Sequence, residues 1–224
     1  LYALELGLEL GARTDGHVSV ITMGPDQARE VLLEAVCMGA ERGYLISDRC
    51  FAGADVCATS HTLSQGIRQS GTYDLILCGK QTTDGDTAQV GAETAEFLGI
   101  AHGANILEVL ETGDTFVTVR MNLENKIQTQ KMELPCLLTV DKDVNTPRLP
   151  SYKRRIGMDL GCIKVMGLDD LEDRDPGHYG LKGSPTQVER IFPPDKKTDK
   201  EIMEGTGREL AQAMAAVLRK HKFI

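Results

Sequence analysis

Residues 79–91 contain most of the side chains that could bind a ligand, in the order Gly-Lys-Gln-Thr-Thr-Asp-Gly-Asp-Thr-Ala-Gln-Val-Gly. They follow a short apolar run, residues 73–78, which is typical of a buried strand, and they lead into a stretch with the apolar spacing of a helix. A strand, a polar turn and a helix start together form an anion site, because the free N–H groups of the first helical turn point outward and the helix dipole favours negative charge. The sequence therefore predicts a phosphate site, with the helix beginning at Thr87.

The side chains of this segment allow two interpretations. Glycines let the backbone approach a ligand closely, and Thr87 and Gln89 can donate hydrogen bonds to phosphate or ribose oxygens. Asp84 and Asp86 would repel a phosphate, although Asp84 could accept ribose hydroxyls. The alternative is that Asp86 caps the helix, the Asp84–Gly85 pair forms a turn and nothing binds. The segment contains neither a Walker lysine motif nor a GxGxxG pattern, so the pattern alone leaves both interpretations open.

The surrounding elements predict an α/β fold. Expected strands at residues 17–22, 44–46 and 73–78 alternate with expected helices at 26–39 and 55–70, which indicates a parallel sheet with right-handed crossovers. Ligands of such sheets bind at the carboxyl ends of the strands, so residues 22–24 and 79–90 should share one rim. Alternating strands at 104–111, 116–122 and 126–132 predict an antiparallel flank, and the apolar strand 136–140 should rejoin the central sheet.

The character of the chain changes near residue 150. We expect an α/β domain at residues 1–150, and an arm at residues 151–224 that contains several prolines and little periodic apolar content. The arm ends in a helix with a capping box at Thr206–Glu209 and one apolar stripe. Either this arm packs on a partner protein or it folds back on its own domain.

Composition excludes several classes of function. The six cysteines are scattered without a CxxC motif, which argues against zinc and iron–sulfur sites and fits reduced thiols in the cytoplasm. The five histidines are dispersed, so structural or exposed roles are expected. A net charge of −8 argues against a nucleic-acid partner. No apolar run approaches the ~20 residues of a membrane span and no signal peptide is expected.

Longer motifs carry a specific resemblance. GKQTTDGDTAQVGAETAEFLGI (residues 79–100) resembles the nucleotide-binding signature of the electron-transfer flavoprotein β subunit, and its Gly-Asp-Thr-Ala-Gln-Val-Gly form resembles the electron-bifurcating branch. Residues 20–55, 134–155 and 183–197 are similar to the same family. The resemblance implies a Rossmann-like fold of the adenine-nucleotide-binding type, with a first strand that precedes the leucine-rich helix at residues 1–11 and is missing here.

The resemblance also implies cofactors and partners. Members form a heterodimer with an α subunit that carries its own FAD; the β subunit holds AMP in mitochondrial-type members and a second FAD in bifurcating ones. NADH is then the electron donor, and ferredoxin or flavodoxin and an acyl-CoA dehydrogenase are the acceptors. The positions that the resemblance assigns to the cofactor are Met23, Gly79, Lys80, Gln81, Thr82, Thr83, Asp84, Gly85, Asp86, Thr87, Ala88, Gln89, Val90 and Gly91.

Two further expectations concern partners. The basic run at residues 153–155 is usually a solvated patch, but the resemblance places it near the loop that recognises redox partners. The same alternating fold with a glycine-rich loop also occurs in small homodimeric stress proteins that bind ATP, which is the alternative function; the basic arm and the terminal helix argue against it.

Overall fold

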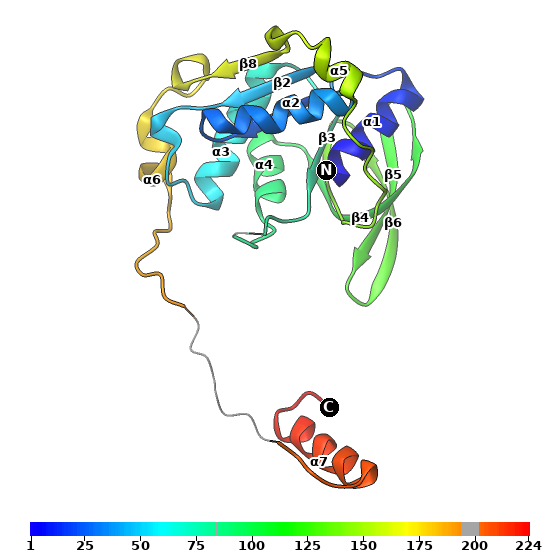
Figure 1. Cartoon of the computed structure of the whole chain (residues 1–224). Coiled ribbons are helices and arrows are strands. Elements are labelled where there is room, and N and C mark those ends of the chain that lie inside the picture. Colours follow the sequence, from blue (N-terminus) through cyan, green and yellow to red (C-terminus); the bar gives the residue numbers. More distant parts are fainter. Residues whose placement is uncertain (84, 194–201) are drawn as a thin grey trace. The chain divides into compact units, whose positions relative to one another are not determined.

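The structure is a computed structural model that describes residues 1–83, 85–193 and 202–224. The chain divides into two compact units, Leu1–Gln187 and Val188–Ile224. The first unit has the predicted α/β class, with helices on both sides of its strands (Figure 1).

One sheet of the first unit is entirely parallel. It contains β1 (Ser19–Met23), β2 (Arg42–Ile46) and β8 (Ile163–Met166), in the order β1-β2-β8. Side chains of a strand alternate between its two faces, so both faces of β2 are covered. On one face Leu45 packs with Leu32 of α2 (Arg29–Met38), which follows the short helix η1 (Asp26–Ala28). On the other face Ile46 contacts α3 (Val56–Ser70) at Gly66.

The second sheet is mixed. Its order is β3-β7-β4-β5-β6, where β3 (Leu75–Gly79), β7 (Cys136–Val140) and the start of β4 (Ala101–Thr112) are parallel. β5 (Phe116–Leu123) and β6 (Lys126–Glu133) extend it as antiparallel strands. The predicted antiparallel flank and the return of residues 136–140 to the central strands are both confirmed.

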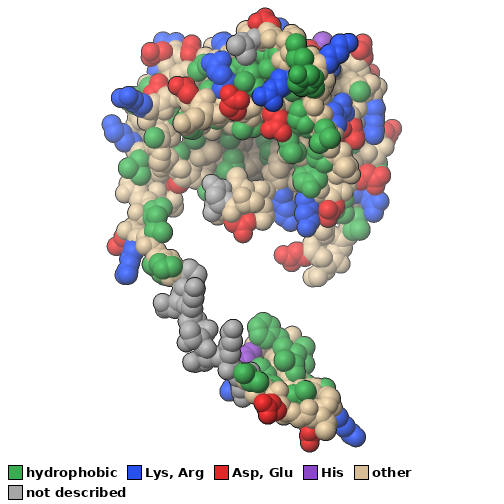
Figure 2. Space-filling model, viewed as in Figure 1, with side chains coloured by type: hydrophobic (Ala, Val, Ile, Leu, Met, Phe, Trp, Pro, Cys, Tyr) green, Lys and Arg blue, Asp and Glu red, His purple; other side chains and the backbone are tan. Residues whose placement is uncertain are grey.

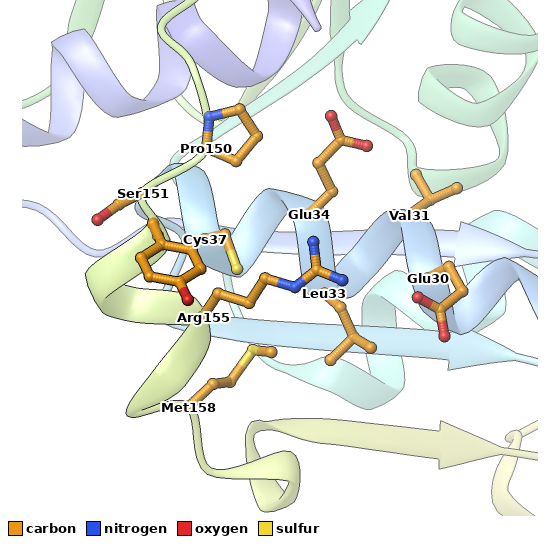
Figure 3. Close-up of a pocket in the computed structure, with 10 residues that line it drawn as sticks. Glu30, Val31, Leu33, Glu34, Cys37, Pro150, Ser151, Arg155 and Met158 are labelled. Atoms are coloured by element: carbon orange, nitrogen blue, oxygen red, sulfur yellow. The ribbon is translucent and has the colours of Figure 1, made fainter.

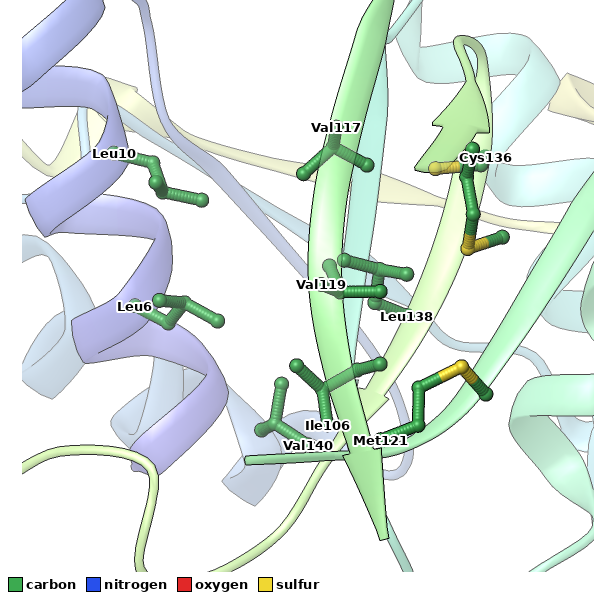
Figure 4. Close-up of a cluster of buried hydrophobic side chains, with 10 residues drawn as sticks. Leu6, Leu10, Ile106, Val117, Val119, Met121, Cys136, Leu138 and Val140 are labelled. Atoms are coloured by element: carbon green, nitrogen blue, oxygen red, sulfur yellow. The ribbon is translucent and has the colours of Figure 1, made fainter. Parts of the chain in front are cut away.

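Helices cover both faces of the second sheet. On one face Leu6 and Leu10 of α1 (Tyr2–Thr14) pack on Ile106, Val119 and Leu138 (Figure 4). On the other face lies α4 (Val90–Leu98), beside α3 (Figure 1). The hydroxyl of Ser60 on α3 lies 3.3 Å from the carbonyl oxygen of Val90. The beginnings of α3 and α4, and with them the carboxyl ends of β2 and β3, therefore lie on the same side of the unit.

The predicted single parallel sheet is instead two sheets. Among the described residues β1 pairs only with β2 and β3 pairs only with β7, so no hydrogen bonds join the first two expected strands to the third. The side chains of β1 and β3 are half-buried, whereas those of β7 are fully buried.

The division of the chain also differs from the boundary predicted at residue 150. Residues 151–187 fold onto the first unit, because β8 pairs with β2 and Tyr179 is completely buried beside Phe51. The other elements of the segment are α5 (Tyr152–Ile156), η3 (Leu160–Cys162), η4 (Leu168–Asp170), η5 (Pro176–His178) and α6 (Gly180–Gly183), and η2 (Arg49–Phe51) lies earlier in the chain.

The second unit is built on α7 (Gly207–Lys220). The predicted capping box is present, since the Glu209 carboxylate accepts a hydrogen bond of 2.8 Å from the backbone N–H of Thr206. Within the described residues of this unit α7 has no buried side chain, and hydrophobic side chains are exposed on it (Figure 2). No described helix of either unit is long and apolar enough to cross a membrane.

Candidate functional site

The loop between β3 and α4 is the candidate site. It leaves the carboxyl end of β3, where the backbone N–H of Lys80 donates to the carbonyl of Val140 and extends the pairing with β7 by one residue. The described residues of the loop from Gln81 to Gln89 are all exposed. Asp84, one of the predicted positions, lies outside the described residues. The structure thus places most of the other positions of residues 79–91 in one accessible segment, with Gly91 buried at its end.

The helix after this loop begins later in the chain than predicted. The expected start at Thr87 is wrong, because Asp86 and Ala88 have φ angles of 52° and 57° and the helix begins only at Val90. Asp86 is therefore not the helix cap, and Gln89 in that position makes no side-chain capping bond. The first N–H groups of α4 are left without a side-chain acceptor from the cap, as an anion site requires.

Residues of opposite backbone handedness follow each other at the end of the loop. Ala88 has a positive φ of 57°, and Gln89 is right-handed with a φ of −104°. Successive residues of opposite handedness point their N–H groups to one side and form the concave anion sites called nests. The backbone N–H groups of residues 87–90 therefore suit a phosphate, although the acidic side chains of the loop would repel one.

Side-chain contacts hold the two ends of the loop. The side-chain amide nitrogen of Gln81 donates a hydrogen bond to the carboxylate of Asp86. This hydrogen bond offsets part of the negative charge that would repel a phosphate. The Lys80 ammonium lies 3.6 Å from a carboxylate oxygen of Asp141, at the end of β7. Lys80 is half-buried and remains available to an anionic ligand from its exposed side.

The glycines of the loop differ in role. A Cβ added to Gly79 would meet no atom within 4 Å, so the space beside it is open to a ligand. At Gly91 a Cβ would lie 2.4 Å from the Thr139 side chain and 2.9 Å from the Cys78 sulfur. Gly91 is buried, so its lack of a side chain lets α4 pack closely on β3 and β7, rather than leaving room for a ligand.

Met23 lies at the carboxyl end of β1, as predicted, but in the other sheet. Its side chain is partly buried against the cluster that contains Tyr44 and Ile46. The structure thus places Met23 and the loop at the ends of two strands that do not pair.

Asp141 is the residue of this site that the sequence analysis missed. It follows the apolar strand at residues 136–140 directly, and that strand was expected to rejoin the central sheet beside β3. Its place in the chain was therefore a usable signal, because the end of a strand next to β3 must lie beside Lys80. Among the described residues no group of three or more metal-ligating side chains is found.

A hollow lies between α2 and α5, apart from the loop. It is a cavity of about 450 Å³ lined in part by Glu30, Val31, Glu34, Tyr152 and Arg155. The Arg155 side chain extends from α5 into the hollow, on the side of α2 (Figure 3). Of the basic run at residues 153–155, Arg155 therefore lines a partly apolar depression.

Comparisons with known proteins agree with this architecture. A model of the electron transfer flavoprotein domain matches residues 1–158. The chain is 39% identical over 222 residues to the electron transfer flavoprotein subunit beta of Clostridium acetobutylicum, covering 99% of this chain and 85% of that one. It is 38% identical over 224 residues to CarD, a caffeyl-CoA reductase-Etf complex subunit of Acetobacterium woodii, with coverage of 99% and 85%.

A third relative extends the range of the similarity. Protein FixA of Bradyrhizobium diazoefficiens is 36% identical over 220 residues, covering 96% of this chain and 76% of that one. These matches run through both the loop at residues 79–91 and the second unit. The chain therefore belongs to the electron transfer flavoprotein family and is similar over almost its whole length to the β subunits of that family.

Proposed function

We propose that this chain is the β subunit of a heterodimeric, electron-bifurcating electron transfer flavoprotein, and that the loop at residues 79–91 holds the diphosphate and adenosine of an FAD. The observation that carries the proposal is the backbone of the loop, where Ala88 and Gln89 have opposite handedness ahead of a helix start without a side-chain cap. Such a backbone suits a diphosphate because its N–H groups converge on one side.

Different groups of the loop would contact different parts of the ligand. The N–H groups of residues 87–90 would bind the diphosphate, and the Lys80 ammonium would add a positive charge near it. Open space beside Gly79 would admit the ligand close to the end of β3. The chemistry that a bound flavin supplies is acceptance of a hydride and release of single electrons, while the protein contributes binding, orientation and electrostatics.

The electron donor and acceptors belong to the same proposal. NADH would be the donor; ferredoxin or flavodoxin, and an acyl-CoA dehydrogenase reached through the FAD of the α subunit, would be the acceptors. The similarity to CarD supports an acyl-CoA acceptor, since the name of that relative places it in a caffeyl-CoA reductase complex. All six cysteines of this chain are free thiols, which suits a reducing cytoplasm.

Two surfaces are proposed for the protein partners. The second unit exposes the large apolar side chains of Val188, Ile191 and Phe192 and, from the stripe on α7, that of Met214, and we assign this unit to the α subunit. The depression beside α5 is lined by Tyr152 and Arg155, and Ile156 of the same helix is also exposed; we assign this surface to a redox partner.

The experiment that tests the proposal is a count of cofactors in the purified complex with the α subunit. Two flavins per heterodimer support an FAD in the β subunit. One flavin with stoichiometric AMP would instead make this chain a non-bifurcating β subunit, in which the nucleotide is structural.

A further inference from the structure

Two histidines that are far apart in the sequence share one carboxylate oxygen. The Nε2 of His61, on α3, lies 3.2 Å from an Oδ of Asp173, and the Nδ1 of His178, on η5, lies 2.7 Å from the same oxygen. His61 is mostly buried, with its ring packed against Phe97 and Tyr179 at centroid distances of 5.3 Å and 5.1 Å. The three residues therefore join α3 to the final segment of the first unit, residues 171–187.

The same segment is held to α3 at a second place. The Asp55 carboxylate, which caps α3, accepts hydrogen bonds from the N–H of Thr186 at 2.9 Å and from its hydroxyl at 2.7 Å. The hydroxyl of Ser184 accepts one of 2.8 Å from the N–H of Asp55. These donors do not titrate between pH 5 and 8, so this anchor is constant there, whereas histidines change charge within that range.

Water has access to the histidine contact. A cavity of about 310 Å³ adjoins it, lined in part by His61, Phe97, His178 and Lys182. His178 is exposed, so protons can exchange at its ring. Other polar groups around the contact include Gln65 on α3, whose Oε1 accepts a hydrogen bond of 3.2 Å from the N–H of Asp173, and Asp175, with an Oδ 3.9 Å from the Nε2 of His178. Lys182 on α6 and the Cys57 thiol on α3 also lie there.

We propose that Asp173, His61 and His178 form a proton-dependent clamp: the Asp173 carboxylate ties residues 171–187 to His61 of α3, His178 closes the turn at residues 173–178 onto the same carboxylate oxygen, and the clamp loosens when His178 loses its proton. With His178 protonated, the contact is a hydrogen bond between opposite charges, which is roughly twice as strong as a neutral one. Without that proton, a neutral His178 ring can still donate to the Asp173 carboxylate, but the attraction between opposite charges is lost, and the oxygen is shared with His61. The segment leads directly to Val188, so the clamp secures the last stretch before the second unit.

The direction of the effect follows from the protonation states. The hydrogen bond with Asp173, reinforced by its negative charge, raises the pKa of His178 above its usual 6.5. Burial opposes ionisation of Asp173, but hydrogen bonds led by that of His178 lower its pKa on balance, so it stays ionised at neutral pH. The contribution of the clamp is therefore complete below pH 6.5 and is lost as the pH rises through the folded pKa of His178.

Hydrogen exchange of the full chain, alone and in complex with the α subunit, tests the proposal. The protection of residues 171–187, corrected for intrinsic exchange rates, should fall roughly two- to fivefold between pH 6 and pH 8. Asp173→Asn should abolish this pH dependence. In an NMR titration of the His178 ring of the full chain, the same variant should return the pKa of His178 toward 6.5.

A matched control separates the clamp from histidine titration in general. The Nδ1 of His17 lies 2.9 Å from the Glu41 carboxylate, near the starts of β1 and β2. His17→Gln should leave the pH dependence of residues 171–187 unchanged, while His178→Gln should remove it. If the wild-type protection is the same at both pH values, or if it stays pH-dependent in His178→Gln, the clamp does not exist.

Discussion

The Lys80 ammonium and the Asp141 carboxylate, 3.6 Å apart, connect the carboxyl ends of the neighbouring parallel strands β3 and β7. Lys80 is the only Lys or Arg in residues 79–91. Asp141 thus fixes the position of the positive charge that the loop offers to a phosphate. The pair lies on the rim where ligands of parallel sheets bind.

Lys80→Ala should lower the affinity of the complex for its β-subunit nucleotide about tenfold or more, since a hydrogen bond to a charged group contributes about 1.5–3 kcal/mol. Asp141→Asn should have a smaller effect, because Lys80 keeps its charge and loses only its fixed position. Calorimetric titration of the nucleotide-depleted complex measures both. Lys126→Ala, on β6, is the control. Equal affinities for all of these variants would show that Lys80 does not contact the nucleotide.

Gly79 and Gly91 should respond oppositely to the same substitution. Gly91→Ala should destabilise the fold by roughly 1–3 kcal/mol, because the new methyl group would overlap the Thr139 and Cys78 side chains. Gly79→Ala fills open space and should leave the stability nearly unchanged while weakening nucleotide binding. Urea unfolding and nucleotide titration of each variant make the comparison. A stable Gly91→Ala variant, or a Gly79→Ala variant with full affinity, would contradict these assignments.

The ion pair between Glu5 and Arg148 should make a contribution to the stability of the fold that is lost in acid. Glu5 is buried on α1, and its carboxylate accepts hydrogen bonds from the Nε and Nη2 of Arg148 at 2.9 Å and 2.8 Å. The hydrogen bond with Arg148 outweighs burial and lowers the pKa of Glu5 below 4.5. The pair therefore stabilises the fold above about pH 4.5, and this contribution is lost as the pH falls through the folded pKa of Glu5.

Glu5→Gln should consequently destabilise the chain at pH 7 by about 1–2 kcal/mol, the lower part of the range for charged hydrogen bonds, because Arg148 is half-exposed. The difference from wild type should shrink below pH 4.5. Urea unfolding at pH 7 and pH 4 measures both values, and Glu108→Gln, in an exposed pair with Arg120, serves as the control. A difference that is the same at both pH values would show that ionisation of Glu5 is not its source.

Much of the fold could be predicted from local patterns, since β1, β2, β3 and the flank lie within a few residues of the expected strands. The start of α4 could not, because the positive φ angles of Asp86 and Ala88 are unusual for residues other than glycine. β8 was missed because its four residues, Ile163–Met166, are too short for a clear period. The His61–Asp173 contact joins residues 112 positions apart, which no local pattern reports.

The basic run beside α5 should contribute to electron transfer. Replacing Lys153, Arg154 and Arg155 by alanine should slow reduction of the acyl-CoA dehydrogenase roughly tenfold at low salt, because charges at an interface act mainly on the rate of association. The difference should decrease as ionic strength rises. Stopped-flow rates at two salt concentrations measure the effect, and Lys126→Ala is again the control. Unchanged rates at low salt would show that the basic run does not contribute to binding the redox partner.

The most direct test of the proposed function is the cofactor content of the co-expressed complex. Its visible spectrum gives the flavin per heterodimer, and chromatography of the released nucleotides gives FAD and AMP separately. The proposal predicts two FAD per heterodimer, falling toward one in Lys80→Ala, with no stoichiometric AMP. One FAD and one AMP per heterodimer would contradict it.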